Sequence, residues 1–135
     1  MKKWKQLFSS ANRAFKNKRF GEALSLYETA LSHLDTLFAE QIHALHADEW
    51  VSAKLTNYHK IATTYVAIDQ LLNAEKHYQI AHVFLLRLIK NQDLPHRFRH
   101  AAKNACHHSY TEWLSFVERF QDQIPLLSNI LDHDG

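Results

Sequence analysis

Residues 58–81 read YHKIATTYVAIDQLLNAEKHYQIA, and this stretch indicates the fold class most clearly. Small and bulky apolar residues recur in it at the spacing of an α-helix, on both sides of a polar turn near residues 69–73. We interpret it as two antiparallel helices that touch through small residues, with bulky side chains filling the space around the contact. The small residues are Ala62, Ala74 and Ala81, and the bulky ones are Tyr58, Ile61, Tyr65, Leu71 and Tyr78.

An earlier stretch of the chain repeats this pattern, and adding 51 to its residue numbers gives the second copy. The pairs related in this way are Ala11 and Ala62, Ala23 and Ala74, Ala30 and Ala81, Tyr27 and Tyr78, and Phe20 and Leu71. A fixed period of this kind is typical of stacked helical hairpins, because one hairpin alone leaves an apolar face uncovered. The repeat therefore predicts a binding scaffold rather than an enzyme.

The composition also favours long helices. The 135 residues suit one domain with one core, and they include only two glycines and two prolines, the residues that the many turns of a β protein need. We expect an all-α fold, a stack of about five long antiparallel helices. Helical hairpins are expected over residues 3–45 and 48–90 and a further helix over 96–121, so that the domain covers 1–121 and a short amphipathic segment, 122–135, caps it.

Local signals suggest where several helices begin. Asp48 is a suitable N-cap for the third helix, and Pro95 suits the start of the fifth. We read the fifth helix as continuous, with a break near Ser109 as the alternative.

Charge and targeting signals argue against nucleic-acid and membrane partners. The formal net charge of +2 is too small to indicate nucleic acid, and no apolar run is long enough for a signal peptide or a transmembrane helix. We therefore expect a cytoplasmic protein. Its single cysteine, Cys106, excludes a disulfide within the chain, and its eleven histidines are the unusual feature of the composition.

The sequence contains none of the catalytic motifs that we sought. HExxH, G-x-S-x-G and glycine-rich phosphate loops do not occur in it. Cys106 is followed by His107 and His108, but adjacent helical side chains point apart and do not form a nucleophile–base pair. We expect neither enzymatic activity nor a cofactor.

The repeated hairpin resembles the tetratricopeptide repeat (TPR). That family places one small residue on its first helix and two on its second, with an aromatic residue between the second pair. The matching residues are Ala11, Ala23, Tyr27 and Ala30, and their partners 51 positions later. The resemblance covers about residues 4–90 and extends to small bacterial proteins of this type. The chain departs from the family in two respects. Its period of 51 residues is longer than the standard repeat of about 34 residues, and Lys18 and Asp69 occupy the position where the family has glycine.

The resemblance implies right-handed α-hairpin repeats whose first helices line a concave groove. It also implies a function there, the binding of a peptide or helical segment of another protein by an adaptor or chaperone-like module. The groove-lining positions would be Lys5, Phe8, Asn12, Phe15 and Lys16 in the first copy and Thr56, His59, Lys60, Thr63 and Val66 in the second. Asn12 matches a family clamp for a C-terminal carboxylate, but Phe8 and Lys60 replace two other residues of that clamp.

Histidines of the fifth helix are further candidate contacts. At 100° per residue, His96, His100 and His107 fall on one stripe opposite Phe98. His100 and His107 would extend the partner-binding surface, as peptide contacts or pH sensors. His96 and His100 would offer two ligands to zinc, but no Asp or Glu joins them, so we assign no metal-binding residue.

Two other functions stay open beside partner binding. The chain would be a self-assembling helical protein, such as a homodimer, if Trp4, Trp50 or residues 125–131 dock onto another copy. Alternatively, it would bind a metal or another small ligand through its histidine-rich face.

Overall fold

The computed structural model describes residues 1–123 of the chain, and this part consists of helices and turns without a strand. Its helices are α1 (Lys2–Lys16), α2 (Phe20–Gln41), α3 (Ala47–Ala67), α4 (Leu71–Lys90) and α5 (His96–Phe120), with a short 3₁₀ helix, η1 (Ile42–Ala44), after α2. The expected all-α fold with five long helices is confirmed over this range. From residue 124 on, the expected capping segment lies outside the described residues. No helix within residues 1–123 is long and apolar enough to cross a membrane.

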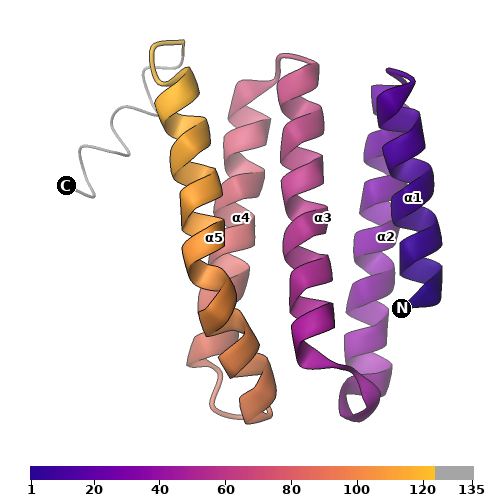
Figure 1. Cartoon of the computed structure of the whole chain (residues 1–135), viewed down its shortest axis with the longest axis vertical. Helices are drawn as coiled ribbons and strands as arrows, with labels where there is room; N and C mark the ends of the chain where they lie inside the picture. Colours follow the sequence, from indigo (N-terminus) through magenta and orange to yellow (C-terminus); the bar gives the residue numbers. More distant parts are fainter. Residues whose placement is uncertain (124–135) are drawn as a thin grey trace.

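The helices form two layers (Figure 1). In this view α2 and α4 lie behind α1 and α5, and α3 stands between the two pairs. Each α-helix packs against the next one along the chain, and α5 also packs against α3. Two pockets open on the side of α1, α3 and α5, one between α1 and α3 and the other between α3 and α5. A partner-binding groove was expected on this side.

Small residues make the helix contacts of both hairpins. The alanines of the repeated pattern expose none of their surface, and they are Ala11, Ala23, Ala30, Ala62, Ala74 and Ala81. Tyr27 is also fully buried, and its counterpart Tyr78 exposes only 8% of its surface. The packing role predicted for these residues is confirmed, because a side chain no larger than a methyl group lets two helices approach closely.

Both hairpins turn through a residue in the left-handed conformation. Lys18 has φ 61° after α1, and Asp69 has φ 58° after α3. In the first turn the backbone N–H of Lys18 donates to Phe15 and that of Arg19 to Ala14, each at 2.9 Å, and the second turn repeats this pattern. This is a Schellman ending, in which glycine is the usual residue because a Cβ is strained there. The motif reverses the chain in three residues, so α4 begins at Leu71, and the turn expected at 69–73 is corrected to 68–70.

The connection between the hairpins differs from the prediction. The second helix was expected to reach residue 45, but α2 ends at Gln41 and the chain continues through η1. Asp48 was expected to cap α3, but the N-cap is His46, whose carbonyl accepts the backbone N–H of Trp50 at 3.0 Å. Asp48 instead lies in the first turn, where its negative charge interacts favourably with the positive end of the helix dipole.

The fifth helix is continuous. It begins at His96, directly after Pro95, and runs to Phe120. Ser109, where a break was the alternative, is fully buried, and its hydroxyl lies 3.3 Å from His82 Nδ1 of α4.

A buried hydrogen-bond network joins α1, α2 and α3. Asn57 of α3 exposes none of its surface. Its Oδ1 accepts the indole N–H of Trp4 at 2.9 Å, and its Nδ2 donates to the backbone carbonyl of Tyr27 at 2.8 Å. This amide fixes α1 against α3, and it therefore sets the shape of the space between them.

Candidate functional site

A pocket of about 580 Å³ lies between α1 and α3. Its lining residues are Ser9, Asn12, Arg13, Phe15, Lys16 and Lys60. Three of these side chains are cations and none is a carboxylate, so the pocket favours an anionic group. The ammonium of Lys60 lies 5.1 Å from the ring centre of Phe15, within reach of a cation–π interaction that holds the two helices' side chains together.

The amide of Asn12 is oriented by a buried tyrosine. The hydroxyl of Tyr27 donates a hydrogen bond to Asn12 Oδ1. Burial raises the pKa of Tyr27 to about 12, so this hydroxyl remains a donor at physiological pH. Because the amide oxygen is engaged, the NH₂ group of Asn12 is the part that remains to donate to a ligand in the pocket.

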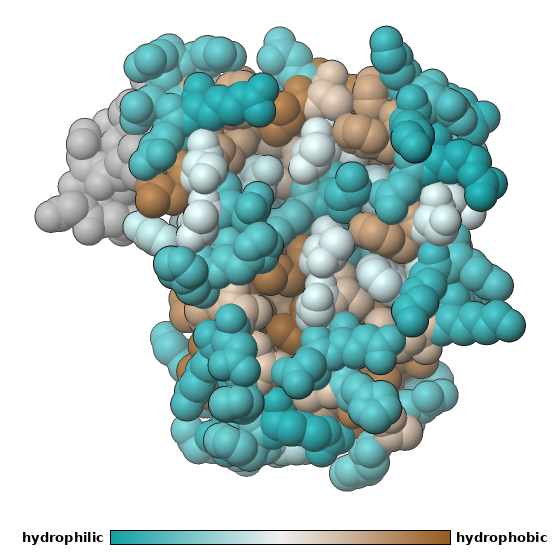
Figure 2. Space-filling view, in the orientation of Figure 1, coloured by the Kyte–Doolittle hydropathy of each residue, from teal (hydrophilic) through white to brown (hydrophobic). Residues whose placement is uncertain are grey.

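A second pocket of about 190 Å³ lies on the same side between α3 and α5. Thr63 and Val66 of α3 line it, together with residues of α4 and α5, namely Tyr78, Glu112, Ser115, Phe116, Arg119 and Phe120. Figure 2 shows this side of the molecule, where polar residues cover most of the surface and apolar residues emerge between them. The side therefore offers both polar and apolar contacts to a ligand.

His59 is partly buried against both α4 and α5. Its ring centre lies 5.6 Å from that of Tyr78 and 5.8 Å from that of His108. Burial, and to a smaller degree the repulsion from His108, lowers the pKa of His59 to about 4. The imidazole is therefore neutral at pH 7, and its buried Nε2 has no hydrogen-bond partner among the described residues.

The structure brings some of the predicted contacts together and separates others. Asn12, Phe15, Lys16 and Lys60 share the first pocket, whereas Thr63 and Val66 line the second. The remaining predicted residues, Lys5, Phe8, Thr56, His59, His100 and His107, line neither of these pockets.

Three of these residues have other contacts. Lys5 forms an exposed ion pair with Glu49 at 3.6 Å. Phe8 stacks on Trp4 with ring centres 4.8 Å apart. His100, which is exposed like His107, stacks on His96 at 5.9 Å.

The tryptophans proposed for self-assembly are not available on the surface. Trp4 exposes 9% and Trp50 exposes 3% of its surface, and the indole N–H of Trp50 donates to the carbonyl of Leu34 at 2.9 Å. The third proposed docking element, residues 125–131, lies outside the described part of the chain.

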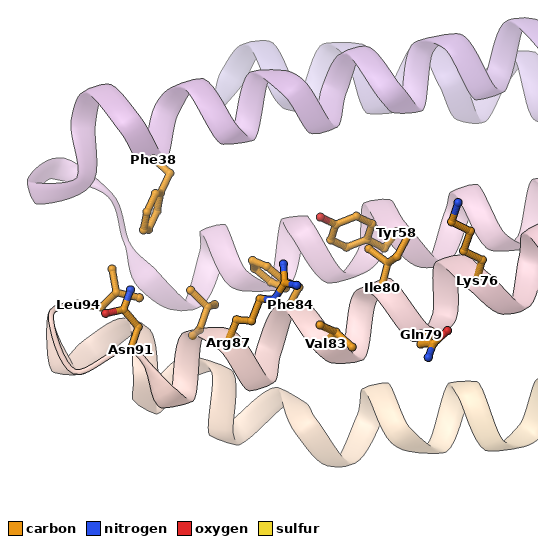
Figure 3. Close-up of a pocket in the computed structure, with 11 residues that line it drawn as sticks. Phe38, Tyr58, Lys76, Gln79, Ile80, Val83, Phe84, Arg87, Asn91 and Leu94 are labelled. Carbon is orange, nitrogen blue, oxygen red and sulfur yellow. The ribbon is translucent and has the colours of Figure 1, made fainter. Parts of the chain in front are cut away.

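Sequence reasoning missed two features of the surface. Arg13 adds a third cation to the first pocket, and its position next to Asn12 was the available signal. The second feature is a groove of about 460 Å³ on the other side of the molecule, between α2 and α4 (Figure 3). Of its lining residues on α4, Phe84 and Leu88 follow the helical spacing of the core positions, so they did not indicate a groove.

The described side chains offer little metal or thiol chemistry. Residues 1–123 contain no group of three or more His, Cys, Asp or Glu side chains placed to hold a metal ion. Burial raises the pKa of the Cys106 thiol, which makes the reactive thiolate scarcer at neutral pH.

Comparison with known proteins gives one match. A family model described as "Protein of unknown function (DUF2753)" matches residues 2–132, nearly the whole chain. No curated protein and no solved structure matches the chain.

Proposed function

We propose that this chain, which belongs to the DUF2753 family, is a non-enzymatic protein-interaction module built from two TPR-like hairpins and a further helix. In this proposal, α1, α3 and α5 line a concave groove that binds an extended or helical segment of another protein. The two α1–α2 and α3–α4 hairpins support the TPR-like interpretation, because their buried alanines and their left-handed turn residues occur at matching positions.

The cationic pocket between α1 and α3 carries the proposal. Arg13, Lys16 and Lys60 line it, no carboxylate of the described part of the chain does, and the NH₂ group of Asn12 adds a neutral donor. Such a set suits a carboxylate of a partner peptide, because charge-assisted hydrogen bonds to carboxylates are stronger than neutral ones. Apolar side chains of the same peptide would reach Val66 and the second pocket. In this proposal, the exposed His100 and His107 of α5 add further contacts to the partner.

Charge reversal at the pocket tests this function. Lys16→Glu combined with Lys60→Glu changes the charge of the pocket without removing a buried hydrogen bond. The matched control is Lys90→Glu with Lys103→Glu, two exposed lysines that line neither concave pocket. Asn12 and His59 are less suitable targets, because Tyr27 donates to Asn12 and His59 packs on Tyr78.

The readout is photo-crosslinking in a native extract. A photoreactive residue replaces Ser9, which lines the pocket, or Ser32, an exposed position on α2. We expect a protein to crosslink at position 9 but not at 32, and the crosslink to disappear in the pocket double variant alone. Equal crosslinking by the pocket variant and the control variant would refute partner binding in this groove.

A further inference from the structure

The groove between α2 and α4 is a second candidate surface, on the side opposite the cationic pocket. Phe38 of α2, Tyr58 of α3 and several α4 residues line it, and its far end is closed by Asn91 and Leu94. In Figure 3, Phe38 points from α2 across the open space towards the side of α4 that carries Phe84. The groove therefore has α2 on one side, α4 on the other and α3 at its base.

Along α4, the partly buried apolar residues of the groove lie between two cations. Ile80, Val83 and Phe84 are partly buried, and they lie between the exposed residues Lys76 and Arg87. At 100° and 1.5 Å per residue, the two cations lie on one face of α4 and about 16 Å apart, which is three turns. Within residues 1–123 no carboxylate lines the groove, so both of its charged side chains are cations.

A buried lysine lies beneath this surface, paired with a carboxylate. Lys54 of α3 exposes only 4% of its surface, and its ammonium lies 5.1 Å from the ring centre of Tyr58 and 5.0 Å from that of Phe84. Both rings also line the groove. Lys54 pairs with Asp35 of α2, a residue outside the lining. The aromatic floor of the groove is therefore backed by an ion pair rather than by apolar residues alone.

We propose that this groove binds an amphipathic helix of a partner protein, with two acidic residues about three turns apart and apolar residues between them. The apolar face of such a helix would cover Ile80, Val83 and Phe84, in the manner of helix-in-groove recognition. Its two carboxylates would then reach Lys76 and Arg87. The proposal does not depend on the concave groove, since the lining residues of the two surfaces do not overlap.

The test is a selection of random 16-residue peptides, displayed in a helical framework, on the full-length chain. We expect the enriched sequences to share Asp or Glu residues three turns apart, with Leu, Ile or Phe on the same face between them. A synthetic peptide of the shared sequence should bind at least tenfold more weakly to Lys76→Glu/Arg87→Glu than to the wild type. Replacing both of its acidic residues by lysine should restore binding to that variant.

Two matched variants separate this groove from other surfaces. Lys90→Glu/Lys103→Glu carries the same change in charge, and Lys16→Glu/Lys60→Glu alters the concave pocket; both should bind the peptide like the wild type. The proposal is overturned if no sequence is enriched, if the acidic pair is missing, or if Lys76→Glu/Arg87→Glu retains binding. It is also overturned if light scattering shows that the wild type is a dimer and that Lys76→Glu/Arg87→Glu is a monomer, because a second copy would then occupy the groove.

Discussion

Acid should destabilise this protein through His59. Burial, with a smaller contribution from His108, lowers the pKa of this imidazole from its ordinary value of 6.5 to about 4. Of the groups that face it, Tyr78 of α4 has its pKa raised by burial and stays neutral, whereas a charge on His108 of α5 would oppose a charge on His59. In acid the unfolded chain therefore binds a proton at residue 59 before the folded chain does.

The sign and size of the effect follow from this difference. The contribution of neutral His59 to the free energy of unfolding is fully present above pH 6.5. It is lost as the pH falls from 6.5 towards 4, because the unfolded state gains the proton first. The fall in pKa from 6.5 to about 4 corresponds to about 3 kcal/mol of unfolding free energy. About 2 kcal/mol of this should be lost between pH 7 and about pH 4.5.

Urea denaturation at pH 7 and about pH 4.5, followed by far-ultraviolet circular dichroism, measures this loss. In His59→Gln, which does not titrate, the loss between the two pH values should be about 2 kcal/mol smaller than in the wild type. His107→Gln, on the exposed side of α5, is the matched control for the replacement of a histidine. If wild type and His59→Gln lose equal stability on acidification, the argument from burial of His59 fails.

The other predictions concern stability at neutral pH, measured by urea denaturation. Lys18→Gly should stabilise the chain by up to about 1 kcal/mol, because a Cβ is strained at φ 61°; a loss of stability would contradict the Schellman turn. Gly21→Ala should stabilise α2 by about 0.5 kcal/mol, since a Cβ there meets no atom within 4 Å. Asn57→Ala should cost about 2–4 kcal/mol by leaving the Trp4 indole unpaired, and a cost below about 1 kcal/mol would refute the network. Ala62→Leu should cost about 1–3 kcal/mol by overpacking, and an unchanged transition would contradict the helix contact.

Periodicity predicted the interior well because it reports which side chains are buried. The alanines 51 residues apart could be recognised as helix contacts before their burial was known. The same signal does not report backbone geometry. Ile42 and Leu45 continue the apolar pattern of α2, so periodicity does not indicate that the α-helix ends at Gln41. Similarly, Asp48 has a cap-forming side chain, but the chain enters α3 two residues earlier, at His46.

The two surfaces differ in how far they could be predicted. Asn12, Phe15, Lys16 and Lys60 were identified from their positions in the repeat, and they do share one pocket. The groove along α4 was missed because Phe84 and Leu88 follow the same helical spacing as the core residues. Whether such residues are covered depends on how closely α2 approaches α4, and this distance is set by tertiary packing and not by the period within either helix.

The order in which the helices pack also bears on how the chain folds. Each α-helix contacts its neighbour in the sequence, and the one major exception, between α3 and α5, spans only a single intervening helix. Closing such short loops costs little chain entropy, so proteins with mainly local contacts fold quickly, within microseconds to milliseconds. The α1–α2 pair has all of its mutual contacts within residues 2–41, so these contacts can form during synthesis, before the later helices have left the ribosome.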